Sequence, residues 1–268
     1  HCEDPQRVKD REQIFAEKYG DNLSAEHHHL IRDVDSCYLS SSLAVDLAKK
    51  YDADLHVFHL TTEKEMELFT SGMIDRKKIT AEVCVHHMLL NDSYYPELGN
   101  QIKCNPSIKT ENDRQALIKS LKEDKIDIIA TDHAPHTWDE KMQDYKDAPA
   151  GLPLVQHGLQ ILMDFYHKDI LSLETIVEKT SHNVAKRFQV KDRGYIREGY
   201  HADLAVLDID KSYQVTKENI LYKCGWSPFL GKTFPSSIYL TIVNGNIAFQ
   251  DGEISKDLPF GMQIEFDR

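Results

Sequence analysis

Short apolar runs alternate with charged, amphipathic segments along the N-terminal part of the chain. The runs are rich in β-branched residues and too short to be helices, which is typical of strands buried in the interior of a parallel sheet. Regular alternation of such strands with helices predicts a parallel sheet, and the even spacing favours half of a (β/α)8 barrel over an open sheet. The predicted strands are residues 55–59, 79–85, 101–104 and 126–131.

Helical periodicity is clearest over residues 36–51, where Leu39, Leu43 and Leu47 form one stripe and Ala48 lies beside it. This spacing is typical of an amphipathic helix that packs its apolar face against a core. Between the last predicted strand and the helices that follow it, residues 138–153 are rich in charged and small residues and are expected to form a loop, either a lid or a binding loop. The other predicted helices are residues 63–71, 111–123, 154–167 and 172–188.

The pattern changes after about residue 192. Residues 202–208 and 237–243 form alternating or continuous apolar runs, and Asn244-Gly245 between 237–243 and a return strand is a strong hairpin signal. We therefore expect two domains, a (β/α) part over residues 1–192 and a small β subdomain over residues 193–268.

A polar cluster follows the predicted strand 126–131. Asp132 comes directly after this run, with His133 and His136 close behind. The C-terminal ends of parallel strands are where α/β folds keep their chemistry, so Asp132 could ligate a metal, carry a proton, or do both. The simpler interpretation is a capped loop in which Asp132 accepts hydrogen bonds from nearby backbone N–H groups.

Similar residues follow the other predicted strands. His59 ends the run 55–59, His86-His87 follow 79–85, Asn105 follows 101–104, and His1 opens the chain. One histidine at a strand end is more often a hydrogen-bonded structural residue than a metal ligand. Several that converge on one edge of a sheet are better explained by a site.

Composition narrows the class of protein. The 268 residues are 41% hydrophobic and 28% charged, as in ordinary globular proteins, and can bury one large core. A formal net charge of −12 argues against a nucleic-acid partner. No apolar run approaches the roughly 20 residues that cross a bilayer, so no membrane partner is expected. The cysteines are odd in number and dispersed, which predicts reduced thiols in a cytoplasmic enzyme; they are Cys2, Cys37, Cys84, Cys104 and Cys224.

The chain lacks an initiator Met and begins abruptly at His1, a candidate ligand. A domain seldom begins on the rim of its own site, so we expect this sequence to be the C-terminal portion of a longer polypeptide.

Taken together, these motifs resemble the amidohydrolase superfamily, and within it the dihydroorotases of the longer, allantoinase-like type. The resemblance extends over essentially the whole chain and rests on the order and spacing of several motifs. These are residues 1–4 (HCED), 59–62 (HLTT), 80–87 (TAEVCVHH), 103–106 (KCNP), 131–136 (TDHAPH), 199–204 (GYHADL), 223–229 (KCGWSPF) and 243–245 (VNG).

The resemblance implies a (β/α)8 barrel that holds two zinc ions at its C-terminal rim. The matching ligands are His1, His59 and Asp132, at the ends of barrel strands 5, 6 and 8. The family's other ligands are a His-x-His pair after barrel strand 1 and a bridging carboxylate, from Asp or carboxylated Lys, after barrel strand 4. Neither is found in this sequence.

The implied reaction is the reversible interconversion of N-carbamoyl-L-aspartate and L-dihydroorotate in pyrimidine biosynthesis. Zinc lowers the pKa of bound water to about 7, and Asp132 would carry a proton from this water to the departing ring nitrogen. The resemblance also implies substrate contacts from Asn105 and His136 and backbone contacts from Gly151 and Leu152. Homodimers are common in the family.

Two other functions stay open. One is a different cyclic-amide hydrolase, such as an allantoinase or a dihydropyrimidinase, and the other is a non-catalytic homologue that acts as a scaffold. Several histidines have plainer interpretations: His86 and His87 are expected to support the rim, and His56 to be packed or solvated. The tract 27–29 is expected to lie on the surface.

Overall fold

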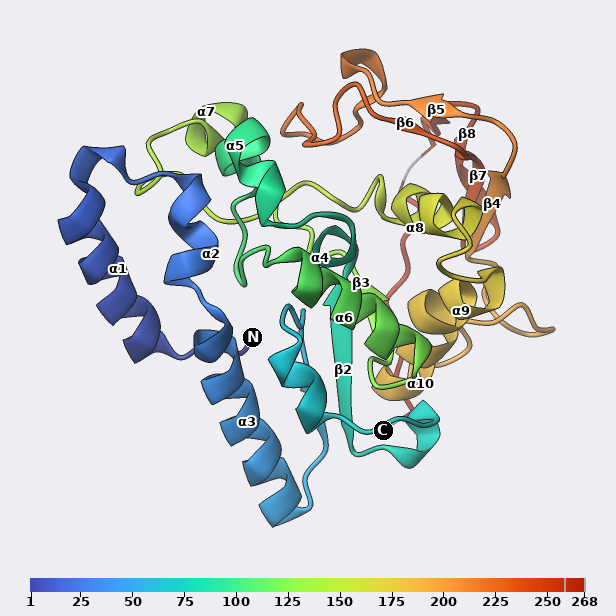
Figure 1. The fold of residues 1–268 in the computed structure, drawn as a ribbon. Helices are drawn as coiled ribbons and strands as arrows, with labels where there is room; N and C mark the ends of the chain where they lie inside the picture. The colour runs from blue at the N-terminus through green and yellow to red at the C-terminus, as the bar shows by residue number, and fades with distance from the viewer. Residues whose placement is uncertain (258, 268) are drawn as a thin grey trace. The chain divides into compact units, whose positions relative to one another are not determined.

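The computed structural model describes residues 1–257 and 259–267 and contains the predicted parallel sheet (Figure 1). Its strands are β1 (Leu55–Val57), β2 (Ile79–Cys84) and β3 (Ile128–Ala130), in the order β1-β2-β3. The parallel pairing aligns Val57 with Ala81 and Cys84 with Ala130. Three of the four predicted strands are therefore confirmed, although β1 and β3 are shorter than their apolar runs.

Two long helices accompany these strands, and both begin at a capping residue. In α3 (Val34–Tyr51), the Asp33 carboxylate accepts a hydrogen bond from the Ser36 N–H. In α6 (Glu111–Lys122), Thr110 and Asp113 form a reciprocal capping box. Such side chains satisfy the N–H groups that the first helical turn leaves unpaired. Both helices are confirmed within a few residues of their predicted bounds.

The apolar face predicted for α3 is wrong. Leu39, Leu43 and Leu47 are 49%, 62% and 45% exposed, whereas small residues of this helix, such as Ser41, are buried. The buried face carries Val45 as well as Ser41, and it includes a polar contact that hydropathy does not reveal: the Ser41 hydroxyl donates to the buried carboxyl of Glu65 at 2.5 Å. Small side chains allow the helix to come close to its neighbours, and the leucines are left on the opposite side.

The strand predicted over residues 101–104 is also wrong. Residues Gly99–Ile102 form the 3-10 helix η6, which begins at Gly99 with a positive φ of 51°. The run is apolar because Ile102 and Cys104 are buried, not because it pairs in the sheet. Asn105 consequently follows a helical turn and not a strand.

The 15-residue helix α1 and several shorter helices complete this part of the chain. The helix predicted over 63–71 is the shorter 3-10 helix η3 (Lys64–Leu68), and the loop predicted over 138–153 begins with a helix. The other elements are α1 (Pro5–Tyr19), η1 (Gly20–Asn22), η2 (Ala25–His27), α2 (His28–Ile31), η4 (Ile74–Arg76), α4 (Val85–Leu89), η5 (Asp92–Tyr94), α5 (Tyr95–Leu98) and α7 (Trp138–Lys141).

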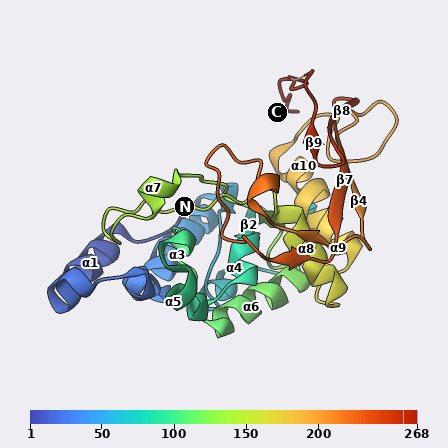
Figure 2. The same ribbon diagram turned by 90° about the horizontal axis from the view of Figure 1, so that it is seen from above.

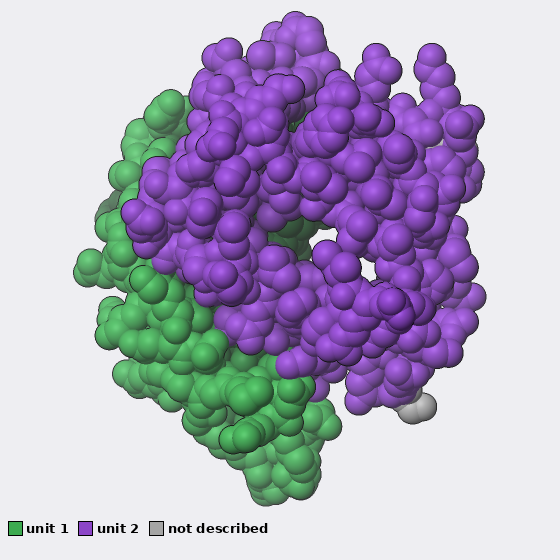
Figure 3. Space-filling model, turned by 90° about the vertical axis from the view of Figure 1, so that its right-hand side faces the viewer, with its two compact units in different colours: residues 1–158, 220–228 green, residues 159–219, 229–268 purple. Residues whose placement is uncertain are grey.

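The chain divides into two compact units (Figure 3). The first consists of residues 1–158 and 220–228, and the second of residues 159–219 and the described part of 229–268. The first unit is therefore discontinuous in sequence, and the β1-β2-β3 sheet lies within it.

The second unit combines short helices with antiparallel strands. Its four-stranded sheet has the order β4-β7-β8-β9 (Figure 2). Asn244 and Gly245 join β7 to β8 with φ values of 50° and 81°, as a tight hairpin requires, which confirms that signal. The strands are β4 (Leu204–Asp208), β5 (Tyr213–Gln214), β6 (Thr233–Phe234), β7 (Ser237–Val243), β8 (Asn246–Gln250) and β9 (Glu253–Ile254). The helices are α8 (Gly158–His167), α9 (Leu173–Val177), η7 (Glu178–His182), α10 (Asn183–Phe188) and η8 (Lys217–Asn219).

Within residues 1–257 and 259–267, none of the helices combines the length and the apolar character needed to cross a bilayer.

Candidate metal and substrate site

Two of the predicted ligands lie in left-handed turns directly after strands. His59 follows β1 with a φ of 39°, and Asp132 follows β3 with a φ of 47°. This backbone region is uncommon for residues other than glycine, and such residues persist where the surrounding structure holds them in place. Both side chains are thus fixed at the C-terminal edge of the sheet by the backbone that carries them.

His1 and His59 are in contact although 58 positions separate them in sequence. His1 Nδ1 lies 3.1 Å from His59 Nε2. Two nitrogens bound to one tetrahedral zinc at 2.0–2.1 Å would lie about 3.3 Å apart, close to this value. His59 is only 5% exposed, and its Nδ1 has no hydrogen-bond partner among the described residues. The pair therefore has the spacing of two ligands of a single ion.

The second nitrogen of His1 is held by a buried carboxylate. His1 Nε2 lies 2.9 Å from Glu3 Oε2, and the same oxygen accepts a hydrogen bond from Arg32 at 2.5 Å. Metal-binding histidines commonly donate their other N–H to a carboxylate, which fixes the ring and its tautomer. Glu3 thus leaves Nδ1 of His1 as the nitrogen available for a metal ion.

The environment of His59 favours the neutral imidazole that binds metals. Burial lowers the pKa of His59, and the negative charge of Asp132 acts in the opposite direction. Asp132 is exposed, and its charge is within electrostatic range of the buried ring. Two imidazoles in contact and a nearby carboxylate are donor types that suit zinc, so these residues fit the metal that the resemblance implies.

The segment that carries Asp132 and His136 pairs with the segment of Gly151 and Leu152. The Ala134 N–H donates to the Leu152 carbonyl at 3.1 Å, and His136 Nε2 donates to the Ala150 carbonyl at 3.1 Å. A Cβ on Gly151 would lie 2.5 Å from the Ala134 oxygen. Only glycine allows this close approach, and the predicted substrate residues His136, Gly151 and Leu152 are therefore neighbours.

Two buried lysines tie this loop to the residues before Asn105. Lys141 Nζ donates to the carbonyls of Lys103 and Pro149 at 2.7 and 2.8 Å. Lys103 Nζ donates to the carbonyls of Tyr145 and Ala148 at 2.6 and 2.5 Å. Burial lowers the pKa of Lys141 to about 7 and that of Lys103 to about 8. Sequence inspection missed both residues, because lysines are usually exposed.

Asn105 is also held by a contact with the His28 ring. His28 Nε2 lies 3.1 Å from Asn105 Oδ1 and 2.9 Å from the Cys104 carbonyl oxygen. His28 is 2% exposed, so the prediction that the tract 27–29 lies on the surface is wrong for its central residue. The polar sequence around His28 conceals this burial, which arises from contacts with residues more than 70 positions away.

The end of β2 differs from those of β1 and β3. Cys84, His86 and His87 are fully buried, and one donor atom from each lies within 4.8 Å of the other two. Burial lowers the pKa of His86 to about 3 and raises that of the Cys84 thiol. His87 Nε2 donates to the Pro106 carbonyl at 3.0 Å, in keeping with a supporting role. His86 has no hydrogen-bond partner for either ring nitrogen among the described residues.

A hollow of about 380 Å³ adjoins the loop after β3. It is lined by His133 and His136 on one side and by residues 222–224 on the other. The indole N–H of Trp226 donates to the His136 carbonyl at 2.8 Å, so residues 220–228 support the same loop.

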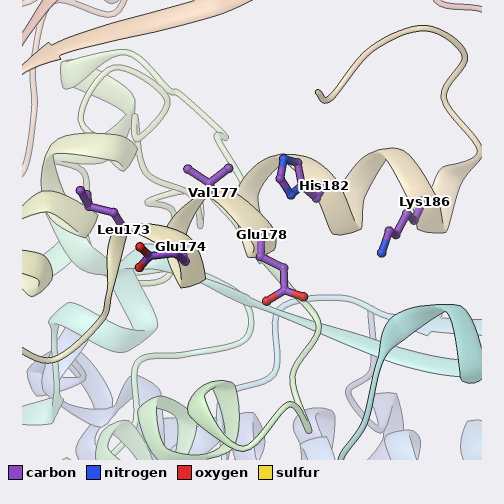
Figure 4. Close-up of a pocket in the computed structure, with 6 residues that line it drawn as sticks. All are labelled: Leu173, Glu174, Val177, Glu178, His182 and Lys186. Atoms are coloured by element: carbon purple, nitrogen blue, oxygen red, sulfur yellow. The ribbon is translucent and has the colours of Figure 1, made fainter. Parts of the chain in front are cut away.

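A larger hollow of about 490 Å³ lies along the helices α9, η7 and α10 of the second unit (Figure 4). Figure 4 shows Glu178 and Lys186 on one side of these helices. None of the predicted site residues lines this hollow; its lining consists of Leu173, Glu174, Val177, Glu178, His182 and Lys186.

Comparison with known proteins identifies the family of this chain. Residues 42–248 match the model of the amidohydrolase family. A dihydroorotase of Endomicrobium trichonymphae is 35% identical over 205 residues, which are 76% of this chain and 49% of that protein. A dihydroorotase of Ligilactobacillus salivarius is 37% identical over 217 residues, 80% of this chain and 51% of that protein. The chain thus spans about half the length of the curated relatives it matches.

Solved structures share the fold at lower sequence identity. L-hydantoinase (dihydropyrimidinase) from Arthrobacter aurescens matches with a TM-score of 0.89 and 22% identity, over 98% of this chain and 59% of that one. D-hydantoinase from Thermus sp. matches with a TM-score of 0.83 and 20% identity, over 95% and 57% of the two chains. The fold is the hydantoinase-like α/β fold, with a parallel sheet and helices, and the chain belongs to the amidohydrolase family.

Proposed function

We propose that this chain forms the C-terminal part of a zinc-dependent cyclic-amide hydrolase that interconverts N-carbamoyl-L-aspartate and L-dihydroorotate. The observation that carries the proposal is the pair of imidazoles, His1 Nδ1 and His59 Nε2, 3.1 Å apart beside the charge of Asp132. The relatives that match most of the chain are named dihydroorotase, which favours this reaction among cyclic-amide hydrolyses.

We also propose an architecture on the basis of this resemblance. We take β1, β2 and β3 as strands 6 to 8 of a (β/α)8 barrel, with residues 1–192 as its C-terminal part and residues 193–268 as a β subdomain. The resemblance assigns two zinc ions to the complete site and further ligands to segments that these residues do not contain. Five free cysteines are consistent with a cytoplasmic enzyme.

The proposed metal ligands are His1, His59 and Asp132. Bound zinc lowers the pKa of coordinated water and polarises a carbonyl oxygen as a Lewis acid. Asp132 is the exposed carboxylate of the group, which suits a proton carrier that exchanges protons between the attacking water and the leaving nitrogen. Glu3 holds the His1 ring through its Nε2 atom, so the ligand nitrogen keeps its direction during turnover.

Asn105, His136, Gly151 and Leu152 are the proposed substrate contacts. His136 and the Gly151-Leu152 backbone lie on neighbouring segments, so a single small ring can touch them together. Because the N–H of Gly151 donates to the Lys103 carbonyl at 2.9 Å, its contact would come from its own carbonyl oxygen.

The test combines zinc content with turnover, on the chain alone and on any longer natural form that contains it. We expect zinc together with cyclisation of N-carbamoyl-L-aspartate, and hydrolysis of L-dihydroorotate in the reverse direction. A panel with hydantoin and allantoin separates the alternatives. Turnover of these rings alone would replace dihydroorotase by another cyclic-amide hydrolase. Absence of both zinc and turnover from every form would favour a scaffold.

A further inference from the structure

His28 is a buried histidine for which the proposed reaction gives no direct role. It begins α2, and each of its ring nitrogens has a polar partner. Nδ1 lies 2.8 Å from the Tyr145 hydroxyl, while Nε2 lies 2.9 Å from the Cys104 carbonyl and 3.1 Å from Asn105 Oδ1. The ring therefore connects α2, the residues around Asn105 and the loop after β3.

These partners define the tautomer of His28. A carbonyl oxygen can only accept, so Nε2 must carry the proton that the Cys104 carbonyl and Asn105 share. Burial lowers the pKa of His28 to about 3, so the ring is neutral at physiological pH and Nδ1 is an acceptor. Burial also raises the pKa of the Tyr145 phenol, whose O–H donates to Nδ1.

The tautomer fixes the direction of the Asn105 amide. Since Nε2–H of His28 is a donor, the atom of Asn105 that faces it must be the oxygen. The NH2 group is then left on the other side of the amide, where it has no hydrogen-bond partner among residues 1–257 and 259–267. Asn105 is half-buried and borders a hollow of about 350 Å³.

We propose that His28 is a positioning residue that turns the Asn105 amide so that its NH2 group, and not its oxygen, meets the substrate. The site then selects ligands with an acceptor oxygen, carbonyl or carboxylate, at this position. The class of substrate rests on the proposed function, whereas the direction of the amide rests on His28 alone.

A hydrogen bond from Tyr145, which is itself held by Lys103, keeps the His28 ring in position. Tyr145, which donates to Nδ1, has its backbone carbonyl bound to the buried Nζ of Lys103. Lys103 in turn accepts the Gly151 N–H on its own carbonyl. A rotation of His28 would break contacts at both ends of this chain of hydrogen bonds, so the ring has one arrangement in which all of them form.

Spectroscopy tests the tautomer without any turnover. Histidine ring 15N spectra of the full chain should show His28 as a neutral ring protonated on Nε2 from about pH 5 to pH 8. A ring protonated on Nδ1, or a positively charged ring at pH 6, would overturn the proposal. Replacement by His28→Gln identifies the resonance.

Kinetics tests the consequence for substrate. Asn105→Asp replaces the NH2 group by an oxygen and keeps the size of the side chain; we expect KM to rise by more than tenfold. His28→Phe should raise KM roughly tenfold with kcat within about twofold, the loss expected for one oriented hydrogen bond. His28→Gln, which keeps an N–H donor, should restore most of this loss.

His29→Gln is the matched control, because His29 stacks on Tyr95 and lies 3.8 Å from Asp92, away from Asn105. An unchanged KM in Asn105→Asp would mean that the oxygen faces the substrate, which contradicts the proposal. If the unmodified protein turns over none of the cyclic amides, the proposed function fails, and the ring spectra still decide the tautomer of His28.

Discussion

The ends of neighbouring strands in this sheet differ in how they present polar side chains. Two positions after the end of β1 and of β3 lies a single left-handed residue, His59 and Asp132 respectively, and both belong to the candidate metal site. β2 runs directly into the helix α4, and its two histidines are buried beneath the rim. A histidine after a strand thus has a different role depending on the backbone that follows it.

This difference has a physical origin. The left-handed residues His59 and Asp132 lie beyond the strand ends in the connecting segments, where His59 meets His1 from a distant part of the chain. A helix that starts at once carries its side chains into its packing face, where imidazoles become neutral and desolvated. Substitutions at the three strand ends test whether their side chains have these different roles.

The largest effect is expected at the end of β3. Asp132→Asn should lower kcat by about a thousandfold, because the amide cannot carry the proton, while the thermal unfolding curve stays unchanged. Asp139→Asn is the control, since it makes the same change of charge at an exposed position of α7. Steady-state rates decide the matter, and near-normal turnover in Asp132→Asn would exclude the proposed role.

The end of β1 should respond in metal binding. His59→Asn keeps a residue that tolerates the left-handed backbone and should weaken zinc binding by at least about a hundredfold, since loss of an outer partner alone costs about 10- to 100-fold. His56→Asn, on the same strand, is the control, because His56 bonds to Thr80 at 2.8 Å. Titration calorimetry with Zn²⁺ measures both variants, and equal affinities would remove His59 from the ligand set.

The loop after β3 is held by the buried amine of Lys141, which titrates near neutral pH. Because the pKa of folded Lys141 is about 7, the folded protein loses a proton that the unfolded chain keeps until about pH 10. The free energy of unfolding should therefore rise between about pH 7 and pH 10, by at most about 1.4 kcal/mol per pH unit for this group.

Lys141→Met should reduce this rise, whereas Lys146→Met, an exposed change in the same loop, should leave it intact. Denaturant unfolding at several pH values measures the slope. Identical slopes in the two variants would show that the Lys141 amine does not titrate in this range.

The smallest effect is expected at the end of β2. His86→Leu removes two ring nitrogens that lack partners among the described residues, so stability should stay within about 1 kcal/mol or increase. His87→Leu should destabilise the protein by about 1 to 3 kcal/mol, because it removes the hydrogen bond to the Pro106 carbonyl. Zinc content should be normal in both, and loss of one ion in His86→Leu would show that Cys84, His86 and His87 bind metal.

Much of the sheet and the contact between two candidate ligands could be predicted from the sequence. Buried parallel strands are continuous apolar runs, which made β1, β2 and β3 visible, and a hairpin needs residues such as Asn244-Gly245. The contact between His1 and His59 follows from their similar positions at the predicted rim.

The predictions that were wrong concern residues whose environment is set by contacts distant in sequence. Residues 101–104 are apolar because they are buried, yet burial does not distinguish a strand from a 3-10 turn in so short a run. Leu39, Leu43 and Leu47 form a regular stripe, but the buried face of the helix is the one that carries Ser41, whose hydrogen bond to Glu65 hydropathy does not mark. His28, Lys103 and Lys141 are polar residues whose partners are backbone carbonyls distant in sequence, and no local pattern marks such partners.

The contribution of residues 220–228 to the first unit has a consequence for synthesis of the protein. While the ribosome has translated only as far as residue 219, the Trp226 indole that binds the His136 carbonyl does not yet exist. The loop after β3 therefore gains this support only after all of residues 159–219 have been made. Formation of this hydrogen bond is a late event of vectorial folding, and a protein cut before residue 220 would keep Asp132 and the lysine contacts of the loop but lose the bond to the His136 carbonyl.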